Sequence, residues 1–134
     1  MARLYLDSNV VISLVEEEPR VREILAGRLA DLGGVNAGCV ISDLVYLECL
    51  VKPLAIGDSA LLEAYEAYVS TVDVVALTRA VCRRAAAIRA THRYQTPDAL
   101  HLAAAVEAGC DSFVTADARL AGFPGIPVVL LERA

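Results

Sequence analysis

The chain has 134 residues, with 17 acidic against 12 basic side chains, and its formal net charge is −5 at pH 7. This length fits one domain, and an apolar content of 57% predicts a packed core rather than a disordered chain. No apolar run approaches the ~20 residues that a membrane span needs, and Arg3 and Asp7 interrupt the N-terminus where a secretory signal would be apolar. We therefore expect one soluble, cytoplasmic domain over residues 1–134. Its acidity disfavours a protein that coats DNA non-specifically.

Apolar and amphipathic segments alternate along the first half of the chain. The expected elements are a strand at 4–6, a helix to residue 15 capped by Ser8 or Asn9, a helix at 19–32 stopped by Gly33-Gly34, a strand at 39–41, and a helix from Ser42 to Val51 ended by Pro53.

The alternation continues in the second half. The expected elements are an amphipathic helix around 61–69, a strand at 72–75, a helix from the cap Thr78 to 91, a helix from the cap Thr96 to 108, a strand at 112–114 and a strand at 126–130. Strands separated by helices of this length favour a parallel sheet. We predict an α/β domain with four or five parallel strands and helices on both faces.

Three aspartates fall where these elements meet. Asp7 follows the first strand, Asp117 follows the fourth, and Asp98 lies in the first turn of a helix, where the dipole favours an anion. Ligands of open α/β sheets bind where strands end, so we expect the three carboxylates at one edge of the sheet. Each could be an ordinary cap or turn residue, but carboxylates brought together repel unless protons or a divalent metal compensate them.

Glu48 adds a fourth carboxylate, beside the apolar stripe of its helix. A carboxylate in that position is costly unless it is compensated, and an ion pair with Lys52, four residues on, is the simplest explanation. Oxygen ligands select Mg²⁺ or Mn²⁺, and the cysteines and histidines lack the spacing of a zinc site. The chain also has no phosphate-binding loop, dinucleotide-binding glycine motif or nucleophile elbow.

Four blocks occur in a set order along the chain. They are Tyr5-Leu6-Asp7-Ser8-Asn9, then Glu48, then Thr96-Pro97-Asp98-Ala99-Leu100-His101-Leu102-Ala103, then Thr115-Ala116-Asp117. Together they resemble PIN-domain ribonucleases, and most closely the VapC-type toxins of bacterial type II toxin–antitoxin systems. The resemblance spans residues 4–129. It departs from the family at Ala116, where many relatives have asparagine.

The resemblance implies a PIN-like fold and an endoribonuclease that depends on one or two Mg²⁺ or Mn²⁺ ions. The catalytic and metal-binding residues it implies are Asp7, Glu48, Asp98 and Asp117, with supporting hydrogen bonds from Ser8, Asn9 and Thr115. It also implies an RNA substrate, a cognate antitoxin whose tail covers the acidic site, and a homodimer or toxin–antitoxin hetero-oligomer. Water activated by metal would leave a 5′-phosphate and a 3′-hydroxyl.

A basic segment complements the acidic site. Residues 74–97 contain five arginines and no acidic residue, and a helical wheel places Arg79, Arg83, Arg89 and Arg93 on one face. That face is either a solvated surface or a contact for RNA phosphates or an antitoxin. Two other classes of protein stay open: a catalytically inert PIN-like interaction module, and a metal-dependent phosphatase, which would have a closed pocket instead of an open basic groove.

Overall fold

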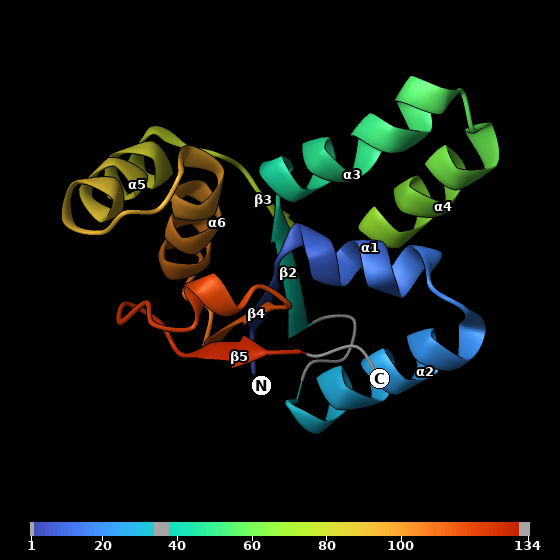
Figure 1. Ribbon diagram of the computed structural model, residues 1–134, viewed down its shortest axis with the longest axis horizontal. Helices are drawn as coiled ribbons and strands as arrows, with labels where there is room; N and C mark the ends of the chain where they lie inside the picture. Colours follow the sequence, from blue (N-terminus) through green and yellow to red (C-terminus); the bar gives the residue numbers. More distant parts are fainter. Residues whose placement is uncertain (1, 34–37, 132–134) are drawn as a thin grey trace.

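Strands and helices alternate along the chain in a computed structural model that describes residues 2–33 and 38–131 (Figure 1). The strands are β1 (Leu4–Leu6), β2 (Cys39–Ser42), β3 (Asp73–Val75), β4 (Ser112–Thr115) and β5 (Val128–Leu130). The helices are α1 (Ser8–Glu16), α2 (Pro19–Asp31), α3 (Asp43–Ile56), α4 (Ser59–Val69), α5 (Arg79–Thr91), α6 (Thr96–Glu107) and the short 3₁₀ helix η2 (Ala118–Leu120).

The five strands form one parallel sheet in the order β3-β2-β1-β4-β5. Tyr5 of the central β1 pairs with Val40 of β2 on one side and with Phe113 of β4 on the other. Helices α5 and α6 lie on one side of the sheet and α1 to α4 on the other (Figure 1). The strand β1 is therefore covered on both faces, and its three apolar residues are at most 1% exposed. The predicted α/β fold with a parallel sheet is confirmed.

The strand order places a topological switch point at the carboxyl end of the sheet, and we call the region outside it the crevice. From β1 the chain builds outward to β2 and β3, and it then crosses over to β4 and β5 on the other side of β1. The switch point therefore lies between β1 and β4, the place where open α/β sheets bind ligands. Asp7 and Thr115 stand at these two strand ends, and the backbone N–H of Asp7 donates to Val114 O at 2.9 Å.

The predicted end of the third helix at Pro53 is wrong. Helix α3 continues through Pro53 to Ile56 and ends at Gly57, whose φ of 67° is the left-handed conformation that favours glycine. Proline in a helix interior loses one backbone hydrogen bond. Pro53 is buried in a helix that packs against α4, and this packing offsets the loss.

Two predicted helix caps are also displaced. The N-cap of α1 is Asp7 rather than Ser8 or Asn9, and the N-cap of α6 is Gln95 rather than Thr96. In the first case the Asp7 carboxylate itself accepts the first free N–H of the helix, which moves the cap one residue earlier. The pair Gly33-Gly34 was predicted to end α2. Gly33 has a φ of 87°, and Gly34 lies outside the described residues.

A polar triad joins α1, α3 and α4. Lys52 pairs with Glu16, and the buried Tyr65 donates its hydroxyl to the second oxygen of Glu16. Burial opposes ionisation, but these two donors hold the pKa of Glu16 below its ordinary value of 4.5. The predicted ion pair between Lys52 and Glu48 is therefore wrong.

Across the described part of the chain, no helix is long and apolar enough to cross a membrane.

Candidate metal-binding active site

Asp7 is the central carboxylate of the crevice and is only 7% exposed. Its Oδ1 accepts the backbone N–H of Ser8 at 2.8 Å. Its Oδ2 accepts the hydroxyl of Thr115 at 2.7 Å and the side-chain amide of Asn9 at 3.3 Å. Three donors thus fix this carboxylate at the start of α1, as a buried charge requires.

Thr115 connects Asp7 to Asp117 through a single buried hydroxyl. It is fully buried at the end of β4, and its Oγ1 accepts the backbone N–H of Asp117 at 3.0 Å while donating to Asp7. Asn9 adds a second link between the same two segments, because its Oδ1 accepts the backbone N–H of Ala116 at 3.0 Å. The side chains of Asn9 and Thr115 therefore hold the ends of β1 and β4 together.

Glu48 enters the crevice from α3. Its Oε1 accepts the hydroxyl of Ser8 at 2.6 Å and lies 2.6 Å from Nε2 of His101. The bond from His101 and that from Ser8 hold the pKa of Glu48 below its ordinary value, against the opposing effect of burial. The same His101 nitrogen lies 3.7 Å from Asp7 Oδ1, so Glu48 and Asp7 are neighbours across it.

Asp98 and Asp117 form the other half of the cluster, with a cation between them. The guanidinium of Arg119 lies 2.5 Å from Asp117 Oδ2 and 3.7 Å from Asp98 Oδ2. Hydrogen bonds from Arg119 hold the pKa of Asp117 below its ordinary value. Burial raises the pKa of Asp98, with Asp117 and Asp7 adding to the effect and Arg119 opposing it. The guanidinium of Arg119 thus offsets part of the negative charge of Asp98 and Asp117.

The donor set fits a hard divalent cation. Within residues 2–33 and 38–131, no three Asp, Glu, His or Cys side chains are arranged to enclose one metal ion. The nearby side chains are nevertheless carboxylates, which are the ligands of Mg²⁺ and Mn²⁺. Burial is the main cause of the raised pKa of Asp98, and the Arg119 guanidinium supplies a positive charge 3.7 Å from its carboxylate.

Three residues of the site, His101, Tyr5 and Arg119, were not predicted from the sequence. His101 is 3% exposed, and its Nδ1 lies 2.8 Å from the hydroxyl of the fully buried Tyr5. One signal was present, because His101 is a polar residue inside the apolar run of α6 and lies three positions after Asp98, on the same helix face. No local pattern marked Arg119.

The four predicted RNA-binding arginines are exposed residues of α5 and of the connection after it. Arg89 has a structural task, since it donates to Tyr94 O at 3.0 Å and to Thr96 Oγ1 at 2.9 Å. These bonds attach the end of α5 to the start of α6, two residues before Asp98. The carboxyl end of α5, with Arg89, is therefore the part of the basic segment attached next to Asp98.

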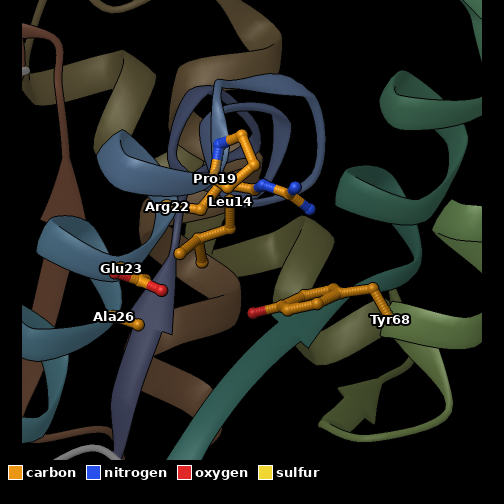
Figure 2. A pocket seen from close by; sticks show the side chains of 6 residues that line it. All are labelled: Leu14, Pro19, Arg22, Glu23, Ala26 and Tyr68. Carbon is orange, nitrogen blue, oxygen red and sulfur yellow. The ribbon is translucent and has the colours of Figure 1, made fainter.

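A separate pocket of about 430 Å³ opens between α1, α2 and α4. Tyr68 of α4 faces Leu14 of α1 and residues of the first turns of α2 across it (Figure 2). None of the four carboxylates lines this pocket. The candidate active site, defined by the four carboxylates at the strand ends, is thus distinct from this pocket.

Fold and site together define an α/β protein with a cluster of carboxylates at the switch point of its parallel sheet. The PIN domain family matches residues 4–125, and the chain belongs to this family. The family resemblance drawn from the sequence blocks is confirmed. No curated protein sequence matches the chain.

Solved structures share this fold over nearly the whole chain. VapBC2 from Rickettsia felis, bound to a promoter DNA fragment, matches with a TM-score of 0.79 at 13% identity, over 96% of this chain and 98% of the other. A toxin–antitoxin complex from Klebsiella pneumoniae matches with a TM-score of 0.75 at 22% identity, over 99% and 100%. The sarcin–ricin loop cleaving toxin VapC20 of Mycobacterium tuberculosis matches with a TM-score of 0.65 at 18% identity, over 92% and 98%.

Proposed function

We propose that this protein is a Mg²⁺- or Mn²⁺-dependent endoribonuclease and the toxin of a toxin–antitoxin pair, acting in the cytoplasm. The observation that carries the proposal is the cluster at the switch point, where hydrogen bonds and one guanidinium link four carboxylates from four separate segments. Membership of the PIN domain family supports nuclease chemistry. The fold shared with a toxin that cleaves the sarcin–ricin loop supports structured RNA as the substrate class.

In this proposal Asp7 and Asp98 are the main metal ligands, and Glu48 and Asp117 bind a second ion or orient water. A divalent ion held by these residues would lower the pKa of bound water and offset charge on the leaving oxygen. The donors around Asp7 fix the orientation of its carboxylate. For a metal ion to bind, the Arg119 guanidinium must move away from the oxygens of Asp98 and Asp117, because the two positive groups compete for them.

RNA cleavage in the presence of Mn²⁺ or of EDTA tests this function. Asp7→Asn and Asp98→Asn are expected to abolish cleavage. Asp58→Asn is the matched control, because Asp58 caps α4 away from the site and asparagine caps a helix equally well. Cleavage that survives EDTA, or equal cleavage by Asp7→Asn, would contradict the assignment.

The chemical groups at the ends of the RNA fragments distinguish this activity from that of a contaminating ribonuclease that uses the RNA 2′-hydroxyl. Hydrolysis by activated water leaves a 5′-phosphate and a 3′-hydroxyl, whereas attack by the RNA 2′-hydroxyl leaves a cyclic phosphate. Ligation of an adaptor to the 3′-hydroxyl of the fragments is therefore expected without prior phosphatase treatment. Cyclic ends would contradict the proposed mechanism. Complex formation with an antitoxin but no cleavage would favour the inert interaction module.

We further propose that the exposed arginines of α5 contact RNA phosphates. Each such contact releases counterions, so the Arg79→Gln/Arg83→Gln variant should lower the slope of log K against log salt by about 1 to 2 units. Binding is measured in EDTA to prevent cleavage. Arg20→Gln, an exposed residue of α2, is the control. An unchanged slope would place the RNA elsewhere.

The expected partners are an antitoxin and a second toxin chain. The fold shared with toxin–antitoxin complexes supports the first of them. An exposed apolar face on α3 supports protein association, since Leu47, Val51 and Leu54 are 58%, 58% and 63% exposed at helical spacing. Light scattering of the purified chain, with Leu47→Lys/Leu54→Lys alongside, tests dimer formation. A monomer in both would contradict a homodimer.

A further inference from the structure

A buried row of polar groups leads from the end of β2 to Glu48. The hydroxyls of Ser42 and Tyr5 lie 2.8 Å apart, Tyr5 Oη lies 2.8 Å from Nδ1 of His101, and Nε2 of His101 lies 2.6 Å from Glu48 Oε1. Ser42, Tyr5 and His101 are all at most 3% exposed. The sequence blocks contain Tyr5 and His101, but the proposed chemistry uses neither.

The bonds in this row have one consistent direction. The Glu48 carboxylate can only accept, so Nε2 of His101 donates to it. In a neutral imidazole Nδ1 then accepts from Tyr5, and the Tyr5 hydroxyl in turn accepts from Ser42, whose Oγ also accepts the backbone N–H of Leu44. Each donor in the row thus has one acceptor.

Tight packing keeps the row in place. The ring of Tyr5 stacks on Phe113, with centroids 5.2 Å apart and planes 12° apart, and it meets the edge of His101 at 5.9 Å. Because β1 and β4 hold these two rings, the Tyr5 hydroxyl stays beside Nδ1 of His101. The imidazole orientation is therefore set by the sheet.

The two oxygens of Glu48 differ as a result. Oε1 accepts hydrogen bonds from the Ser8 hydroxyl and from Nε2 of His101, at 2.6 Å each. The described residues give Oε2 no hydrogen-bond donor, so this oxygen is available to a cation. His101 itself cannot ligate a metal in this arrangement, because both of its nitrogens are engaged.

We propose that His101, held in its Nε2–H form by Tyr5, is a positioning residue that fixes Glu48 for one-oxygen binding of a divalent cation. This inference rests on the proposed metal-dependent function and adds a specific role for two residues outside the carboxylate set. Partners that orient metal-binding carboxylates typically contribute about 10–100-fold to metal affinity or activity. The role is therefore measurable on metal binding alone.

Mn²⁺ affinity of the purified protein, measured by electron paramagnetic resonance without RNA, tests the role of His101. His101→Leu is expected to weaken binding about 10–100-fold. His101→Gln keeps an N–H donor and should restore most of that affinity. Equal affinity in the wild type and His101→Leu would overturn the inference. No Mn²⁺ binding by the wild type would instead overturn the proposed function.

Tyr5→Phe is the second variant, and it leaves the aromatic packing in place. It should weaken Mn²⁺ binding several-fold, whereas Tyr65→Phe, which also removes a buried tyrosine hydroxyl but one bonded to Glu16, should leave it unchanged. If His101→Leu fails to fold, this pair decides the question. Equal effects of the two variants would show a merely structural role and overturn the inference.

Nitrogen NMR of the metal-free protein supplies a signature that does not depend on activity. The chain has two histidines, so His92→Gln assigns the signals. The expected spectrum shows His101 protonated at Nε2 and unprotonated at Nδ1, with a mixture of tautomers in Tyr5→Phe. A proton on Nδ1 in the wild type would overturn the direction of the row and the role of Tyr5.

Discussion

Thr115→Val probes how the two halves of the active-site crevice are held together. The Thr115 hydroxyl is fully buried, donates to Asp7 Oδ2 at 2.7 Å, and accepts from Asp117 N at 3.0 Å and from Asn9 Nδ2 at 3.3 Å. Valine has nearly the same shape, so the substitution removes these bonds without opening a cavity. The cost therefore reports the hydrogen bonds themselves.

The expected magnitude follows from the partners. A hydrogen bond to a charged group contributes about 1.5–3 kcal/mol, and each of the two neutral bonds contributes about 0.5–1.5 kcal/mol. Burying a methyl group in place of the hydroxyl returns about 1 kcal/mol. We expect Thr115→Val to lower the free energy of unfolding by about 1.5–5 kcal/mol, which is a large part of the stability of a typical domain.

Urea unfolding followed by circular dichroism in EDTA measures this change without any metal contribution. The matched variant is Thr115→Ser, which keeps the hydroxyl and loses one buried methyl, for a cost of about 1 kcal/mol. Thr115→Ser should also retain RNA cleavage, whereas Thr115→Val should lose most of it. If valine costs no more stability than serine, the hydroxyl does not hold the site together and the reasoning is refuted.

Three further predictions concern other parts of the fold. Because the folded pKa of Glu16 is lowered, its carboxylate stabilises the protein above its unfolded pKa, and this contribution is lost as the pH falls through the folded value. In urea unfolding, Glu16→Gln should therefore be less stable than the wild type at pH 7 and approach it in acid; a constant difference would contradict this. Gly27→Ala, where the added Cβ meets nothing within 4 Å, should raise the free energy of unfolding by about 0.5–1 kcal/mol, whereas Gly57→Ala, at a φ of 67°, should lower it by about 1 kcal/mol in thermal melts. Arg119→Ala should strengthen Mn²⁺ binding several-fold in calorimetry because it removes a competing cation, and Arg84→Ala, which removes the same charge beside α6, should not.

Local patterns predicted most of the fold because the forces behind them act within a few residues. The apolar run Leu4–Leu6, followed at once by the polar Asp7-Ser8-Asn9, indicates a buried strand that leads directly into a helix, and the structure contains both. The helix end at Pro53 failed for the opposite reason. The proline rule is local, and burial of Pro53 against another helix overrides it.

The carboxylates of the candidate site were predictable because the ends of parallel strands meet at one edge of a sheet. Asp7 and Asp117 follow β1 and β4, so adjacency of those strands brings them together. The partners of Glu48 were not predictable. Sequence spacing favoured Lys52, four residues away, but Lys52 instead pairs with Glu16 on another helix.

The sequence by itself determined the order of strands and helices, the family, and which carboxylates stand at element ends. Only the tertiary structure decided their partners: His101 and Ser8 for Glu48, Thr115 for Asp7, and Arg119 between Asp98 and Asp117. The physical reason is distance along the chain. Glu48 and His101 are 53 residues apart, and Asp7 and Thr115 are 108 apart. Strand order and helix packing bring such pairs within hydrogen-bond reach, and hydrophobic periodicity within one element does not record which strand or helix its neighbour will be.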